Sequence, residues 1–80
     1  MKITILAFGI AKEIFNSSSV ELHVEEGSTV AILKNELETI YPQIKKLSSY
    51  LIAVNNEYAE DDIVLRSTDE TAIIPPVSGG

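Results

Sequence analysis

Residues 20–42 read VELHVEEGSTVAILKNELETIYP, and the spacing of apolar residues changes within this stretch. Val20, Leu22 and Val24 alternate with polar residues, which is the pattern of a strand with one face in water. From Val30 onwards, apolar residues recur instead at the spacing of an amphipathic helix. The stretch therefore predicts a strand that is followed directly by a helix.

The expected helix has clear start and stop signals. Either Ser28 or Thr29 can cap it by accepting a hydrogen bond from a backbone N–H group. Pro42 ends the helix near Ile40, because proline disfavours helical geometry at the residue before it. The helical side chains expected to be buried against a sheet are Val30, Leu33, Leu37 and Ile40.

The chain before this stretch supplies a second strand. Residues 2–8 would be apolar on both faces of an extended chain, which is typical of a strand at the centre of a sheet. The short connection to residues 20–24 predicts an antiparallel hairpin, with a helical turn at residues 10–15. We expect this start of the chain to belong to the fold and not to a signal peptide, because Lys12 and Glu13 follow the apolar run at once.

The chain after the helix is made of short segments. Asn55-Asn56 can adopt the positive φ of a tight turn. The segments expected to be strands or strand-like are residues 51–54, 58–60, 63–66 and 71–74. One helix beside several strands predicts an α+β fold with a mixed sheet, and the strongly apolar first and last strands are expected side by side at its centre. This arrangement is the β-grasp, or ubiquitin-like, roll, with residues 1–75 as the domain and 76–80 as an extended tail.

The composition restricts the partners and the chemistry. The 80 residues include 6 basic and 12 acidic ones, for a net charge of −6, so we expect neither nucleic acid nor a membrane as partner. A protein partner with a basic face is expected instead. The chain has no cysteine and one histidine, His23, which excludes disulfides, thiolate–metal sites and a histidine metal cage. Lack of cysteine also agrees with the cytoplasmic location that we expect.

Acidic pairs and serines offer little for catalysis. The pairs Glu25-Glu26, Asp61-Asp62 and Asp69-Glu70 all fall in expected turns, where water prevents the pKa shifts that acid–base catalysis needs. A nucleophile among Ser17, Ser18 and Ser19 would need a base, and only His23 could serve. No enzyme active site is expected in this chain.

The C-terminus is the unusual feature. Residues 73–80 read IIPPVSGG, so a buried strand leads through two stiff prolines to two residues without side chains. A bare Gly79-Gly80 backbone can enter a narrow channel where any Cβ atom would clash. A frayed terminus is the plain alternative. We expect the carboxylate of Gly80 to be the reactive group.

Together these segments resemble the small sulfur-carrier subunits of molybdopterin synthase, a family of ubiquitin-like proteins. The resemblance runs the full length, and residues 73–80 are its most specific part. The other matching segments are residues 1–5 with Phe8, 12–14, 26–30 with Leu33, 41–42 and 53–58. Asn56 stands where this family usually has glycine, and Ser67-Thr68-Asp69-Glu70 replaces its Asp-Gly-Asp-Glu turn. Thr68 disfavours positive φ, so a different type of turn is expected there.

The resemblance implies a carrier that is not an enzyme by itself. A ubiquitin-activating-type adenylating enzyme would use ATP and magnesium to convert the Gly80 carboxylate to an acyl-adenylate, and a sulfur donor would leave a thiocarboxylate there. The charged tail would enter the large catalytic subunit of the synthase and deliver sulfur to a cyclic pyranopterin, in molybdenum cofactor biosynthesis. This chain would itself bind no cofactor or metal, and the assembly would hold two copies of each subunit.

Specific roles follow for residues of the tail and the domain. Gly80 would carry the sulfur. The residues expected to enter the partner are Val77, Ser78 and Gly79, and those expected at the interface are Phe8, Pro75 and Pro76. For Phe8, a place in the core is an equal alternative. A sulfur carrier for thiamine or a similar pathway, a protein modifier and a plain interaction domain are the alternative functions.

Overall fold

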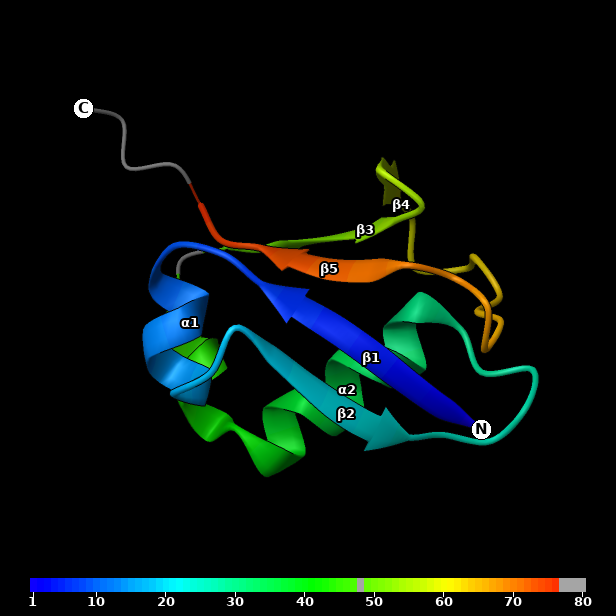
Figure 1. The fold of residues 1–80 in the computed structure, drawn as a ribbon, viewed down its shortest axis with the longest axis horizontal. Coiled ribbons are helices and arrows are strands. Elements are labelled where there is room, and N and C mark those ends of the chain that lie inside the picture. The colour runs from blue at the N-terminus through cyan, green and yellow to red at the C-terminus, as the bar shows by residue number, and fades with distance from the viewer. Residues whose placement is uncertain (48, 77–80) are drawn as a thin grey trace.

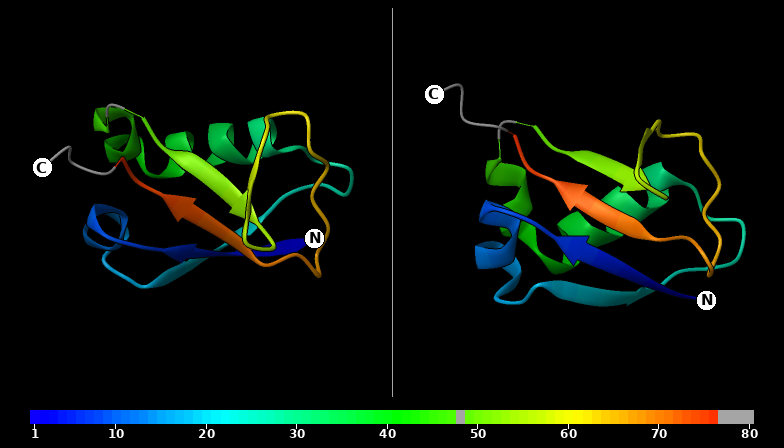
Figure 2. Two further views of the ribbon diagram at one scale, coloured as in Figure 1. Left: turned by 90° about the horizontal axis from the view of Figure 1, so that it is seen from above. Right: turned by 45° about the horizontal axis from the view of Figure 1, so that its top comes forward.

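The computed structural model describes residues 1–47 and 49–76, and these form a five-stranded mixed sheet with one main helix across it (Figures 1 and 2). The elements are β1 (Lys2–Ala7), α1 (Ile10–Phe15), β2 (Ser19–His23), α2 (Val30–Ile40), the 3-10 helix η1 (Pro42–Lys46), β3 (Leu51–Val54), β4 (Glu57–Ala59) and β5 (Thr71–Ile74). The strand order is β2-β1-β5-β3-β4. The predicted α+β, β-grasp arrangement is confirmed.

The central strands pair as expected. β1 and β2 are antiparallel, with Ile5 opposite Val20, so the predicted hairpin is present with α1 in its connection. β5 is the middle strand of the sheet and runs parallel to β1, with Leu6 opposite Ala72. The first and last strands therefore lie side by side, and the end of β5 lies at the same end of the sheet as the end of β1 (Figure 1).

Helix α2 packs on one face of the sheet. Thr29 caps it, and its hydroxyl oxygen accepts a hydrogen bond from the Ile32 N–H group at 3.4 Å. The fully buried helical side chains are Val30, Leu33 and Leu37. Most of the helix prediction is thus confirmed.

The prediction that Ile40 is buried was wrong. Ile40 is 50% exposed, although the helix ends at this residue as predicted. The next residue takes the inward position: the Tyr41 ring lies 4.7 Å from the Phe15 ring, measured between centroids. Ile44 on η1 is fully buried and continues the core beyond the helix. The residues three and four positions after a buried helical residue both lie near its face of the helix. Here the residue at the fourth position, Tyr41, faces the core in place of Ile40.

Residues 63–66 do not form a strand of the sheet. Val64 makes an isolated antiparallel bridge with Thr29, in the loop before α2. The Val30 N–H group donates to the Ile63 carbonyl at 2.9 Å, and the Leu65 N–H group donates to the Ser28 carbonyl at 2.8 Å. The segment therefore takes its backbone partners from the start of α2, and it fills the core with Leu65.

Two turns, an asparagine turn at residues 55–56 and an acidic turn at residues 67–70, are fixed by backbone conformation and side-chain hydrogen bonds. Asn55 and Asn56 have φ values of 53° and 69°, as the predicted tight turn requires. In the 67–70 turn, Thr68 is not among the described residues with positive φ, in agreement with the expected change of turn type. The Asp69 carboxylate closes this turn by accepting from the Arg66 N–H group at 2.9 Å and from the Asn55 side chain at 3.0 Å.

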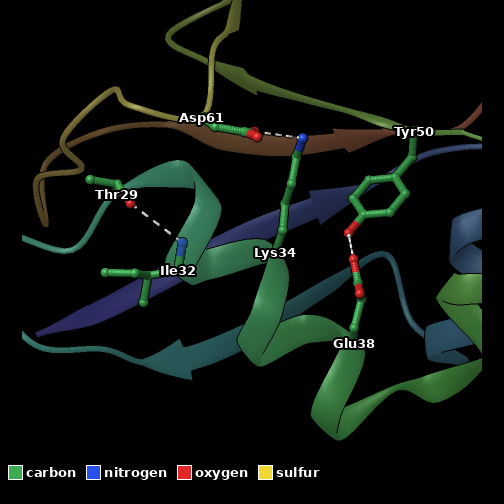
Figure 3. A network of polar contacts seen from close by, with 6 residues as sticks. All are labelled: Thr29, Ile32, Lys34, Glu38, Tyr50 and Asp61. Carbon is green, nitrogen blue, oxygen red and sulfur yellow. Dashed lines mark hydrogen bonds and ion pairs between the residues drawn. The ribbon is translucent and has the colours of Figure 1, made fainter.

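Two polar contacts attach α2 to the segments around the β3–β4 hairpin (Figure 3). Lys34 forms an ion pair with Asp61 at 2.9 Å, and the Tyr50 hydroxyl donates to Glu38 at 2.6 Å. Burial and the neighbouring Glu38 raise the pKa of Tyr50 well above its ordinary value, so this hydroxyl remains a donor at any physiological pH. These contacts are all on the helix side of the sheet.

Replacing Thr71 with valine should stabilise the domain. Thr71 is fully buried on the inner face of β5, and its hydroxyl has no hydrogen-bond partner among the described residues. Because valine has the same shape without the buried polar group, we expect Thr71→Val to raise the free energy of unfolding by about 1 kcal/mol. Urea unfolding would measure it. Thr4→Val on the exposed face of β1 is the control, and a destabilised Thr71→Val variant would contradict the prediction.

Candidate functional site

The sheet has a second face that α2 does not cover. In Figure 1, α2 lies behind the strands, and the viewer looks onto this outer face. Alternation along β1 points Ile3 and Ile5 into the core and leaves Leu6 and the following Phe8 on the outer side. Because residues 2–8 are apolar on both faces of the strand, apolar side chains remain on the face that α2 does not cover.

The register of the sheet brings small apolar residues into one row across this face. Leu6 lies opposite Ala72, Ala72 lies opposite Ala53, and Ala53 lies opposite Tyr58. Because alanine side chains are short, they form a floor between the larger side chains at the two ends of the row. The resulting groove has a volume of about 410 Å³ and is here called the outer groove. Its lining residues are Leu6, Phe8, Ala53, Asn56, Tyr58, Glu70, Ala72 and Ile74.

Phe8 belongs to this groove and not to the core. Its side chain is 49% exposed, so the core alternative for Phe8 was wrong. Tyr58 is 70% exposed at the opposite side of the same groove. Large apolar side chains with this exposure, collected in one concave surface, are typical of a protein-docking site.

The outer groove is polar at one end and apolar at the other. β1 and β5 run in the same direction, from Thr4 towards Phe8 and from Glu70 towards Ile74. Glu70 and Asn56 line the end where β5 begins, whereas Phe8 and Ile74 line the end where it finishes. The apolar end therefore leads directly to Pro75 and Pro76.

The predicted interface prolines lie at this apolar end. Pro75 and Pro76 are both half-buried and follow β5 without a break. The other predicted tail residues, Val77, Ser78, Gly79 and Gly80, lie outside the described residues. Phe8, Pro75 and the start of the tail are thus close together, and their roles stay predictions.

The acidic pairs have no catalytic arrangement in the described part of the chain. Asp61 pairs with Lys34, and Asp69 closes a turn, so each has a structural partner. Glu25 and Glu26 are exposed. Within residues 1–47 and 49–76, no group of three or more His, Cys, Asp or Glu side chains is placed to hold a metal ion. None of the helices found there has the length and apolar character needed to cross a membrane.

The sequence interpretation missed three residues that line the outer groove. Ala53, Ala72 and Ile74 were assigned to strands but given no role. The signal was available, because each alternates with a fully buried neighbour, Ile52 or Ile73. Strand alternation alone would have placed these three residues on the outer face.

The sequence matches the family described as the ThiS family over residues 5–80. A molybdopterin synthase sulfur carrier subunit from Dictyostelium discoideum is 43% identical, over 95% of this chain and 93% of that protein. One from Arabidopsis thaliana is 35% identical, over 100% of this chain and 84% of that protein.

Solved structures share the fold. A putative molybdopterin converting factor subunit 1 from Pyrococcus furiosus has a TM-score of 0.86 at 23% identity, covering 96% of this chain and 99% of that one. A chain in the complex of subunits 1 and 2 of the Helicobacter pylori molybdopterin-converting factor has a TM-score of 0.71 at 21% identity, covering 100% of this chain and 100% of that one. A Caldiarchaeum subterraneum ubiquitin has a TM-score of 0.66 at 24% identity, covering 100% of this chain and 98% of that one.

Proposed function

Because this chain belongs to the ThiS family, we propose that it carries sulfur as a thiocarboxylate on Gly80. The chain is a sulfur carrier subunit of molybdopterin synthase, and the catalytic activity lies in a partner subunit. The observation that carries this conclusion is the 43% identity to such a subunit over 95% of the chain. The Gly-Gly end at residues 79–80 supports the chemistry, since it offers a bare backbone and a free carboxylate.

The charging reaction needs two steps, because a carboxylate is a poor electrophile. In the first, a carboxylate oxygen of Gly80 attacks the α-phosphate of ATP on an adenylating partner, and pyrophosphate leaves. In the second, a sulfide-equivalent donor attacks the acyl carbon of the adenylate, and AMP leaves. The product is a thiocarboxylate. On the large subunit, its sulfur replaces an oxygen substituent of a cyclic pyranopterin, and water then cleaves the acyl carbon–sulfur bond, which returns Gly80 to a carboxylate. The ATP and magnesium belong to the adenylating partner in this proposal.

The outer groove is the proposed docking surface for the large subunit. Its apolar end is continuous with Pro75, so a partner that covers the groove also receives the tail. The Helicobacter pylori relative of the same fold is described in complex with its subunit 2, which supports a contact of this kind. Acidic residues outside the groove would favour a basic partner surface, and a cytoplasmic assembly with two copies of each subunit is part of the proposal.

Reconstitution tests the proposed function. The full chain would be incubated with adenylating enzyme, ATP, magnesium and sulfide, and its mass recorded. A rise equal to the exchange of one oxygen for one sulfur is expected. The charged protein would then be mixed with the large subunit and cyclic pyranopterin, and formation of the dithiolene followed. A chain that gains sulfur but cannot give it to the pterin would belong to another sulfur pathway, and one that gains none would be a plain interaction domain.

Replacing Phe8 with alanine should weaken docking without unfolding the domain. A partner that covers the outer groove would bury the exposed half of the ring, so we expect Phe8→Ala to lower affinity for the large subunit about 10- to 30-fold. Isothermal titration calorimetry would measure the affinity. Ile40→Ala is the matched control, because Ile40 is equally exposed at the end of α2 and does not line the groove. Equal losses of affinity in the two variants would contradict the docking role.

A further inference from the structure

Gly9 lies between β1 and α1 in a conformation that other residues avoid. Its φ is 55° and its ψ is −134°, which is the geometry of the first central position in a type II′ turn. Glycine is the usual residue there, since an added Cβ atom strains the backbone. The turn redirects the chain from the sheet into α1.

The same residue lies against the first proline of the tail. A Cβ atom added to Gly9 would lie 3.3 Å from the Cγ atom of Pro75, which is closer than ordinary van der Waals contact. Gly27 offers a contrast: its φ is 87°, also positive, but a Cβ atom there would meet nothing within 4 Å. Of the two glycines that the structure describes, only Gly9 makes such a close approach, so the approach does not follow from positive φ.

The contact extends the pairing of β1 with β5 beyond the two strands. Ala7 lies opposite Ile73 in the parallel register, and Gly9 and Pro75 each follow two residues later. The Pro75 ring thus packs on a bare stretch of backbone at the end of the neighbouring strand. The ring also fixes φ of Pro75 near −65°, and the following Pro76 keeps residue 75 in an extended conformation. The position of the ring therefore sets the direction in which the chain leaves at Pro76.

We propose that Gly9 is a positioning residue for sulfur transfer, acting through Pro75. This inference rests on the proposed function of Gly80. When a partner covers the outer groove, the direction in which the chain leaves Pro75 determines where Gly80 lies in that partner. A tilt of ~10° there would move the end of a four-residue extended chain by about 2 Å, and displacements of ~1 Å can lower a rate ~100-fold.

The test compares Gly9→Ala with Gly27→Ala. Both variants place a side chain at positive φ, so both should lower the melting temperature, by about 5–10 °C. Each protein would be thiocarboxylated and bound to saturating large subunit, and the single-turnover rate of sulfur transfer to cyclic pyranopterin measured. We expect Gly9→Ala to lower this rate at least ~10-fold with little change in affinity, and Gly27→Ala to leave it unchanged.

A second substitution, at Pro75, tests whether Gly9 acts through this proline. Pro75→Ala removes the Cγ atom that a Cβ atom added at Gly9 would contact too closely. Adding Gly9→Ala to this background should therefore lower the transfer rate less than twofold. The proposal would be overturned if Gly9→Ala transferred sulfur as fast as Gly27→Ala, or if its full deficit persisted with Pro75→Ala. Failure of the wild-type chain to deliver sulfur would instead overturn the proposed function, and the inference with it.

Discussion

Deletion of Gly80 should leave the melting temperature unchanged and reduce sulfur transfer to background. The deletion moves the terminal carboxylate back by one residue, about 3.5 Å along an extended chain. Since displacements of ~1 Å can cost ~100-fold in rate, neither the adenylating step nor the pterin step should proceed at a useful rate. The core residues found in the structure all precede Pro75, so the deletion removes none of them. Calorimetry and single-turnover transfer assays would measure the two quantities on the same protein.

A second variant distinguishes the effect of tail length from the effect of side-chain size. Gly79→Ala keeps the carboxylate at its distance but adds a Cβ atom next to it. If the partner receives the tail in a narrow channel, Gly79→Ala should also transfer sulfur slowly. A chain with one glycine added after Gly80 would test the effect of a tail that is too long. A Gly80 deletion that delivered sulfur at the wild-type rate would show that the Gly-Gly end is a frayed terminus without a role in transfer.

The strands and the main helix could be predicted because their signals are local. The alternation of Val20, Leu22 and Val24 and the helical spacing from Val30 each report a face that is buried. Pro42 marked the end of α2 correctly, since its effect acts on the adjacent residue. The neighbouring placement of β1 and β5 was predictable too, because strongly apolar strands are typical of the centre of a sheet and not of its edges.

Features that depend on distant partners could not be predicted in the same way. Whether Ile40 or Tyr41 faces inwards is decided by Phe15 on another helix, which no local period reveals. Residues 63–66 have the composition of a strand, but Ile63 and Leu65 form backbone hydrogen bonds with the first residue of α2 and with the loop before it. The approach of Gly9 to Pro75 arises only when the first and last strands pair. Each of these contacts is set by tertiary structure.

The core under α2 should account for much of the stability of so small a domain. Leu37 is fully buried on the helix face that meets the sheet. Leu37→Ala removes this side chain and leaves a cavity, so we expect the free energy of unfolding to fall by ~2–5 kcal/mol. Small domains have about 5–15 kcal/mol in total, so this one change should populate the unfolded state measurably near physiological temperature. Urea unfolding with far-ultraviolet circular dichroism would give the value.

Ile40→Ala on the same helix is the control for this loss. Ile40 is 50% exposed, so its truncation leaves no closed cavity and should cost less than ~1 kcal/mol. A similar cost at both positions would contradict the inward packing of Leu37. The comparison also bears on function, because the outer groove lies on strands whose inner faces rest on this core. Folded Leu37→Ala protein should still dock and deliver sulfur normally, and its activity should fall only in proportion to the fraction that is unfolded.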